Sequence, residues 1–377
     1  MFIWELKDWP AFEWDEAVLR PKLADLRLLQ GRLLGQTDAA SAQADLEVEM
    51  EALIQNAIRT SEIEGEHLDV GSVRSSVARQ LGLERAGMSS RTTPESEALV
   101  ALLLQATHQP DALISIEQLC QWQSMLFPEG SGRLSKVGVG ELRGAQTMQV
   151  VSGRLDRPTI HFEAPPTLKL EAELEAFVDW FNSPPAGMDP LLRAGVAHLW
   201  LITIHPFDDG NGRLIRAVTD RALAQAERQS VRFYSLSAAI MDRRSGYYDL
   251  LEQTQRGGLE ITPWLKWFLD TLEHALQQAL HRLERVLNKA RFWQVHGGKV
   301  LNERQVKVLN RLLDTAGEEF EHGINTRKYQ ALTKVSKATA TRDLVELQSL
   351  GCLHRLPGGG RSTRYALGTG ISDAEYP

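Results

Sequence analysis

Twelve consecutive residues, 205–216, concentrate side chains that suit chemistry at phosphorus. The segment reads His-Pro-Phe-Asp-Asp-Gly-Asn-Gly-Arg-Leu-Ile-Arg. His205 is a candidate general base, because a neutral imidazole can take the proton of a hydroxyl as its oxygen attacks phosphorus. Asp209 offers hard carboxylate oxygens that suit Mg²⁺, an ion that takes its remaining ligands from water and phosphate. The segment therefore predicts a polyphosphate site with a base beside it.

The second half of the segment adds anion-binding groups. Gly210 and Gly212 let backbone N–H groups approach an anion, and they precede a helix whose N-terminus favours negative charge. Arg213 and Arg216 are three residues apart on that helix, so both guanidinium groups lie on one face and match phosphate oxygens. Any one of these residues alone is more typical of a helix end and a turn. All of them together fit a simple turn poorly.

The segment matches in full the signature His-x-Phe-x-Asp/Glu-Gly-Asn-Gly-Arg-x-x-Arg and in this resembles the Fic family. The resemblance implies transfer of AMP from ATP to a hydroxyl side chain of a protein, with release of pyrophosphate. It also implies a role for each residue. His205 would deprotonate the target hydroxyl, and Asp209 would hold Mg²⁺ between the α- and β-phosphates. Asn211 and the amides of Gly210 and Gly212 would bind phosphate oxygens. Arg213 would neutralise pyrophosphate, and Arg216 would hold the γ-phosphate.

A second motif ends an amphipathic helix expected over residues 44–61. On composition alone, Glu64 is only an acidic residue near a helix end, with Gly65 as a helix cap. The pattern Thr60-x-x-x-Glu64-Gly65 nevertheless resembles the inhibitory motif Ser/Thr-x-x-x-Glu-Gly/Asn of one class of Fic proteins. A Glu64 carboxylate paired with Arg216 would occupy the guanidinium that the γ-phosphate needs. The resemblance thus predicts an autoinhibited enzyme.

Two short β-prone runs, 147–151 and 159–162, flank a turn at 152–158 and predict a hairpin. In Fic proteins the corresponding hairpin is a flap along which the target is laid as an added strand, so the resemblance implies target docking along 147–162. It also implies that nucleotide contacts come from Val150, Val151, Ser152, Gly153, Tyr247 and Gln255. His161 in the hairpin and His198 in the helix before the signature are interpreted as structural.

The elements that must position these groups are mainly helical. Periodic apolar residues predict helices over 114–127, 169–182, 190–204, 214–227 and 270–293, with Ser115 as an N-cap. The fold class is thus mainly α: a Fic-type core with a small hairpin flap, an N-terminal helical region and a C-terminal winged helix-turn-helix. We expect domains at 1–115, 116–290 and 300–370. The aromatic residues that open the chain are interpreted as a cap packed on a neighbouring helix.

The C-terminal part changes in character. Helices predicted over 306–313, 326–332 and 337–350, followed by strands at 352–356 and 364–367 around the glycine run 357–361, have the order of a winged helix-turn-helix. Between Gly323 and Leu367 the sequence contains two acidic residues and eight basic ones: Arg327, Lys328, Lys334, Lys337, Arg342, Arg355, Arg361 and Arg364. Such a patch suits DNA phosphates, although winged helices also dock proteins. The helix over 270–293 is interpreted as a spacer or a homodimer surface.

Composition excludes several classes of protein. With 43% hydrophobic and 24% charged residues, the chain of 377 residues is typical of a globular protein with a sizeable core. A net charge of −7 argues against a chain that coats nucleic acid over its whole surface. Its two cysteines, Cys120 and Cys352, indicate neither a disulfide framework nor a zinc site, and the charged N-terminus does not resemble a signal peptide. We expect a cytoplasmic protein with no membrane contact.

Two other functions stay open at this stage. Glu64 could orient a water molecule, in which case the enzyme would remove AMP from modified proteins. The chain could also be a nucleotide-sensing, DNA-binding transcriptional regulator whose catalysis has been lost, although the complete signature argues against lost chemistry. For the transferase, the acceptor is a Ser, Thr or Tyr hydroxyl of a target protein or of the chain itself.

Overall fold

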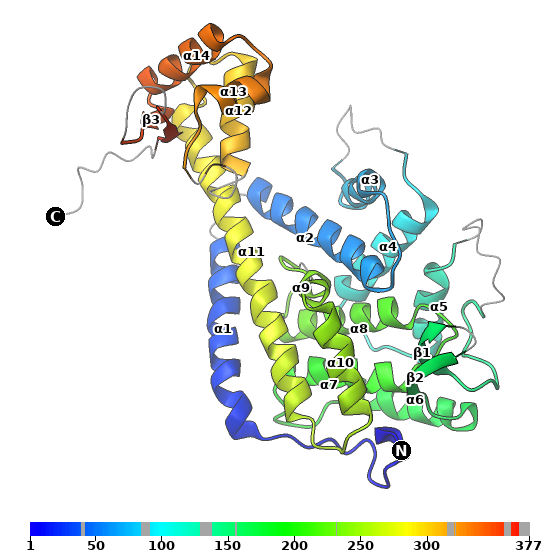
Figure 1. The fold of residues 1–377 in the computed structure, drawn as a ribbon. Helices are drawn as coiled ribbons and strands as arrows, with labels where there is room; N and C mark the ends of the chain where they lie inside the picture. The colour runs from blue at the N-terminus through cyan, green and yellow to red at the C-terminus, as the bar shows by residue number, and fades with distance from the viewer. Residues whose placement is uncertain are drawn as a thin grey trace. The chain divides into compact units, whose positions relative to one another are not determined.

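The computed structural model describes residues 1–38, 42–83, 91–128, 138–154, 157–230, 232–314, 320, 322–357 and 363–368. Their helices and strands fall into two compact units, Met1–Gln36 with Val48–Ala279, and Thr37–Glu47 with Leu280–Pro377. Long helices dominate and the two sheets have two strands each, which confirms the predicted mainly α class (Figure 1). The finer division of the first unit at 115/116 stays a prediction.

Among the described residues, the first unit contains a 3-10 turn, η1 (Ile3–Glu5), eight complete helices, parts of three more that it shares with the second unit, and the first hairpin. The helices are α1 (Glu16–Asp38), α2 (Ala42–Ile63), α3 (Val70–Gln80), α4 (Pro94–His108), α5 (Ile116–Met125), α6 (Thr167–Asn182), α7 (Pro190–Ile204), α8 (Asn211–Glu227), α9 (Leu236–Asp242), α10 (Arg244–Gln255) and α11 (Thr262–His296). The last of these begins eight residues before the predicted start at 270 and contributes to both units. Its first turns carry Trp264 and Phe268, which are buried.

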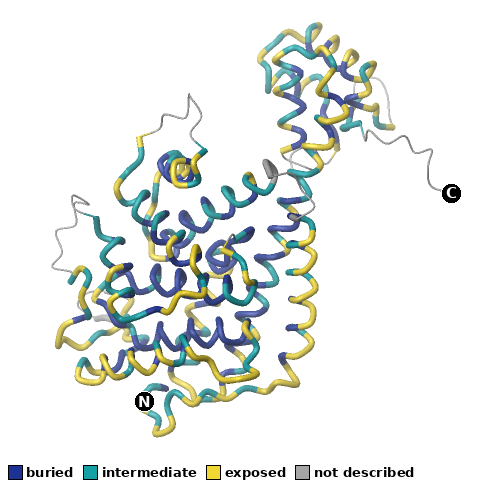
Figure 2. The backbone as a smooth tube through the Cα atoms, turned by 180° about the vertical axis from the view of Figure 1, so that it is seen from behind, coloured by how far each residue is buried: buried dark blue, intermediate teal, exposed yellow. Residues whose placement is uncertain are grey.

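Helices α7 and α8 form the centre of the first unit. Every residue of α7 from Leu191 to Ile204 is buried, as expected for a helix that is apolar on all sides (Figure 2). The helix begins sharply because Asp189 accepts a hydrogen bond from the Leu191 N–H and Pro190 occupies the first turn. The N-terminal rings of Trp9 and Phe12 lie edge-on to Trp200 of α7, so the aromatic cap packs as predicted. Together α7 and α8 hold both ends of the segment 205–216.

The hairpin consists of β1 (Gln149–Arg154) and β2 (Arg157–Glu163), paired antiparallel. The predicted turn over 152–158 was too long, because Ser152 pairs with Thr159 and the strands continue to Arg154 and Arg157. Leu155 and Asp156 lie outside the described residues. A bulge interrupts the register: Val150 faces Phe162, whereas Val151 faces Ile160. His161 is therefore the extra residue of β2.

The second unit is built around the predicted winged helix-turn-helix, which is confirmed. Helices α12 (Glu303–Asp314), α13 (Thr326–Thr333) and α14 (Lys337–Ser349) precede β3 (Leu353–Arg355) and β4 (Tyr365–Leu367), which pair antiparallel. Asn325 and Ser336 cap α13 and α14 through their side chains. The core includes Tyr329, Leu344 and Leu347. Residues 358–362, with Arg361 of the predicted wing, lie outside the described part.

Candidate active site

His205 is held at the C-terminal end of α7 in an unusual backbone conformation. Its φ of 52° places it in the left-handed region, and its N–H donates to the Leu201 carbonyl at 3.1 Å. Arg143, which is buried, donates through Nε to the His205 carbonyl at 2.8 Å. The Arg143 N–H donates to the Pro206 carbonyl. Arg143 thus holds the backbone that follows α7 through two hydrogen bonds.

The hydrogen bonds of His205 also define its chemistry. Nδ1 lies 3.3 Å from the Ile202 carbonyl oxygen, which can only accept, so Nδ1 carries the proton and Nε2 carries the lone pair. Burial lowers the pKa of His205 below its usual value of 6.5, because the charged imidazolium loses its water. A neutral imidazole with a basic Nε2 is the form that a general base needs.

The loop after His205 is closed by its own asparagine. The Asn211 carboxamide accepts from the Phe207 N–H at 3.0 Å and donates to the Phe207 carbonyl at 2.7 Å. Asn211 is 3% exposed, and the Phe207 ring is fully buried. Gly210 has a φ of 84°, which allows the chain to turn directly into α8. The Asn211 side chain thus bridges the loop, and the predicted contact of Asn211 with a phosphate stays a prediction.

Asp209 lies beside this turn, with Oδ1 2.6 Å from the Gly210 N–H. Within the described residues, no group of three or more His, Cys, Asp and Glu side chains could hold a metal by itself. A single carboxylate such as that of Asp209 fits Mg²⁺, an ion that binds through one carboxylate and completes its shell with phosphate and water. Asp209 is the residue that would hold it.

Glu64 and Arg216 form the ion pair predicted from the two motifs. Arg216 Nη2 lies 2.7 Å from Glu64 Oε1, and the Arg216 side chain is 2% exposed whereas that of Glu64 is 32% exposed. Arg216 also donates to the hydroxyl and the carbonyl of Thr60 at 2.7 and 2.8 Å. A Cβ built on Gly212 would lie 1.9 Å from Glu64 Oε1. The carboxylate therefore rests directly on the first turn of α8, where an anion would bind.

The position of Glu64 is fixed by how α2 ends. Gly65 adopts a φ of 80°, and the Gly65 and Glu66 N–H groups donate back into the last turn of the helix. The carbonyl of Ile63 accepts from Arg244 Nε at 2.9 Å and from the Tyr248 hydroxyl at 3.3 Å. Helix α10 thus anchors the turn that carries Glu64. Sequence reasoning missed this role of Arg244, because nothing in its local pattern indicates a partner 181 residues away.

A pocket of about 510 Å³ joins most of the predicted residues. Its walls include these predicted positions: Glu64, Val150, Val151, Ser152, His205, Asp209, Gly210, Asn211, Gly212, Tyr247 and Gln255. The two arginines of the signature are not among the described residues that line this pocket. Arg216 lies behind Glu64, and Arg213 lines a neighbouring pocket. Arg213 Nη1 lies 2.7 Å from Glu66 Oε2. Gly153 lies in β1, and its contact with a nucleotide stays a prediction.

Two adjacent tyrosines, Tyr247 and Tyr248, form the aromatic wall of the pocket. Tyr247 is 2% exposed, and its hydroxyl lies 3.0 Å from His198 Nε2, while His198 Nδ1 lies 2.9 Å from the Thr219 hydroxyl. His198 is therefore structural, as predicted. Tyr248 also lines the pocket and is 36% exposed, so its ring is the more accessible of the two. The resemblance assigns the nucleotide contact to Tyr247 and not to Tyr248; both tyrosines line the pocket, and the contact stays a prediction.

Comparisons with known proteins agree with this geometry. The Fic/DOC family matches residues 113–223, a DeoR-like helix-turn-helix domain matches residues 321–364, and a domain of unknown function (DUF4172) matches residues 2–83. The chain is 25% identical over 253 residues to a protein adenylyltransferase Fic of Aedes aegypti, covering 65% of this chain and 46% of the relative. It is 32% identical over 112 residues to a protein adenylyltransferase Fic of Nematostella vectensis, covering 29% and 24%. The chain thus spans less than half the length of these relatives.

The fold has a counterpart among solved structures. A Fic family protein from Desulfovibrio desulfuricans G20 superposes with a TM-score of 0.51 at 18% identity, over 92% of this chain and 96% of that one. No helix in the described part of the chain combines the length and the apolar character that crossing a bilayer requires.

Proposed function

We propose, from the premise that residues 113–223 form a domain of the Fic/DOC family, that the protein transfers AMP from ATP to a hydroxyl side chain of a protein. The observation that carries the proposal is the single pocket that contains His205, Asp209 and the first turn of α8. A base, a carboxylate and a helix N-terminus around one space are what an attack on the α-phosphorus of ATP requires.

In the proposed reaction, His205 Nε2 takes the proton of the acceptor hydroxyl as the oxygen attacks the α-phosphorus and pyrophosphate leaves. The Ile202 carbonyl keeps the other imidazole nitrogen protonated and so keeps Nε2 basic. Backbone N–H groups at the start of α8 stabilise phosphate charge. Mg²⁺, held at Asp209, would neutralise part of the charge on the phosphates.

The proposed resting state is inhibited. Glu64 occupies Arg216 and rests on Gly212, so the γ-phosphate of ATP meets a carboxylate where it needs a cation. A shift of about 1 Å in the α-phosphorus is enough to slow such a reaction roughly a hundredfold. Activation then means moving the end of α2 away from α8.

We assign target docking to β1 of the hairpin. Arg256 already donates to two carbonyls of β2, at 2.7 Å to Ile160 and at 3.1 Å to His161. Val151 of β1 is 51% exposed and offers an apolar contact beside the pocket. A target segment paired with β1 by its main chain would present its hydroxyl with little selectivity for its other side chains.

The test compares wild type, Glu64→Gly and Glu64→Gly/His205→Ala, each incubated with Mg²⁺ and ATP that is labelled at the α- or the γ-phosphate. We expect α-label on protein in the Glu64→Gly variant, little in wild type and a strong reduction in the double variant, which has lost the base His205. Label from the γ-phosphate would show phosphorylation instead. Loss of AMP from a pre-modified protein, without label transfer, would show the reverse reaction.

A second function is favoured by the winged helix. Asp343, one of the two acidic residues between Gly323 and Leu367, is 1% exposed and bonded to Tyr329 and Arg304, so it offsets little of the basic surface. Lys337 and Arg342 of α14 are exposed on the second helix of the helix-turn-helix. We propose that this helix contacts DNA. Full-length protein should shift duplex DNA in a salt-dependent way, and Lys337→Glu/Arg342→Glu should abolish the shift.

A further inference from the structure

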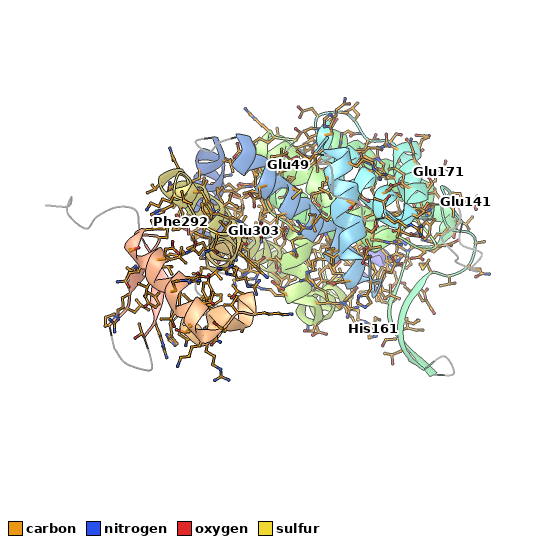
Figure 3. All side chains as sticks on the ribbon, turned by 90° about the horizontal axis from the view of Figure 1, so that it is seen from above. Glu49, Glu141, His161, Glu171, Phe292 and Glu303 are labelled. Carbon is orange, nitrogen blue, oxygen red and sulfur yellow. The ribbon has the colours of Figure 1, made fainter. Side chains whose placement is uncertain are left out.

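A serine, a histidine and a glutamate form a relay at the edge of the nucleotide pocket, separate from His205. His161 Nε2 lies 2.6 Å from the Ser152 hydroxyl, and His161 Nδ1 lies 2.6 Å from Glu252 Oε2. All three residues line the same pocket as His205. Figure 3 labels His161, which belongs to strand β2 of the hairpin. The resemblance to the Fic family assigns no role to Glu252.

The direction of the relay follows from the tautomer of His161. A carboxylate only accepts, so in the neutral tautomer that donates Nδ1–H to Glu252, Nε2 accepts from the Ser152 hydroxyl. The serine is thereby bonded to a basic nitrogen, and the base is oriented by a third group. This is the arrangement that activates a hydroxyl as a nucleophile.

The bulge in β2 creates the arrangement. His161 is the extra residue that faces no partner in β1, since Val150 pairs with Phe162 and Val151 with Ile160. Bulges next to active sites commonly redirect a side chain. Here the imidazole reaches both Ser152, on the neighbouring strand, and Glu252, on α10. Arg256 holds Glu252 in place, with Nε 3.1 Å from Glu252 Oε1.

We propose that Ser152 is an acceptor of AMP within the chain, with His161 as its base and Glu252 as the residue that positions His161. The proposal rests on the proposed transferase function, which supplies ATP to the pocket. The bond between Ser152 Oγ and the α-phosphorus forms, and the bond from that phosphorus to the bridging oxygen of the β-phosphate breaks. Pyrophosphate leaves, and the serine proton moves to His161 Nε2, where the imidazolium faces Glu252.

The site is suited to act when no target is bound. Ser152 is exposed on β1, the strand to which we assign the target, and it lines the same pocket as His205. Once modified, Ser152 carries a nucleotide and a negative charge on that strand. Self-modification would therefore compete with target docking.

The experiment follows AMP on one peptide. Trypsin cuts after Arg143 and Arg154, and the peptide between them, residues 144–154, contains only two hydroxyl side chains, Thr147 and Ser152. In the Glu64→Gly protein incubated with Mg²⁺ and ATP, we expect this peptide to gain one AMP. Ser152→Ala should remove the modification, Ser152→Thr should retain it, and the matched control Thr147→Ala should leave it unchanged.

Two further variants test the relay. Removal of a general base lowers a rate by about 10²–10⁴-fold, so His161→Gln should slow modification of Ser152 by at least about a hundredfold. Glu252→Gln keeps an acceptor for Nδ1–H but removes the charge, so it should slow modification while the KM for ATP stays unchanged. A merely structural role for Glu252 would instead loosen the pocket and raise that KM.

The outcomes separate the two proposals. AMP on other residues with pyrophosphate release, but none on Ser152, would overturn the acceptor assignment and leave the transferase function standing. Modification of Ser152 that persists in His161→Gln would overturn the role of the relay. No pyrophosphate release and no AMP on any peptide would overturn the transferase function itself, and the acceptor assignment with it.

Discussion

Replacing Glu64 with glycine should convert a restrained enzyme into an active one. The carboxylate does two things in the structure: it pairs with Arg216 at 2.7 Å, and it covers Gly212 at the start of α8. Glycine removes both contacts. Arg216 then keeps its two bonds to Thr60, so the guanidinium stays in place and becomes available to the γ-phosphate.

The expected gain in activity follows from the free energy of the Glu64–Arg216 ion pair. A hydrogen bond to a charged group contributes about 1.5–3 kcal/mol, and the lower part of that range applies because the Glu64 side chain is 32% exposed. About 1.5–2 kcal/mol corresponds to roughly 10- to 30-fold in productive ATP binding. The same loss should lower the free energy of unfolding by a similar amount and the Tm by roughly 3–8 °C.

The assay is the initial rate of AMP transfer at several ATP concentrations, together with a thermal melt. Glu62→Gly is the matched control, because it removes a neighbouring carboxylate whose partner is Arg59 on the surface of the same helix. We expect that control to lose stability without gaining activity. Our reasoning is refuted if Glu64→Gly is folded, binds ATP and transfers AMP no faster than wild type.

Three further predictions concern Asn211, His205 and His198. Asn211→Ala should remove both bonds to Phe207 and leave a buried N–H unpaired, so it should lower the free energy of unfolding by about 1–3 kcal/mol in a denaturant melt and abolish transfer. Because burial lowers the pKa of His205, kcat/KM should rise with pH below 6.5 and stay level through neutral pH, which a pH–rate profile checks. Burial also lowers the pKa of His198 to about 3. As the pH falls below 6.5, His198 is therefore protonated in the unfolded chain but stays neutral in the folded chain. The free energy of unfolding should then fall by up to about 1.4 kcal/mol per pH unit, and it should fall less steeply in the His198→Gln variant. Urea melts at neutral and acidic pH measure this difference.

Local patterns predicted what depends on neighbours in the sequence. The apolar run before His205 gave a buried helix, Ser115 gave a helix start, and the order of elements after residue 300 gave a winged helix. These outcomes depend on helical periodicity and capping, which act within a few residues. The Glu64–Arg216 pair spans 152 residues and was predicted only because a family motif supplied the partner.

What escaped prediction depends on geometry between distant segments. The sequence did not predict the two hydrogen bonds between the Asn211 carboxamide and the Phe207 backbone, because they form only once the loop has closed. His161 reads as a structural residue of a hairpin, yet a one-residue bulge turns it toward Ser152 and Glu252. Without the bulge, Ile160 and Phe162 would share one face, whereas here Phe162 is buried and Ile160 is 40% exposed. The burial of Phe162 against the helical body thus fixes the register, and the register in turn assembles the relay.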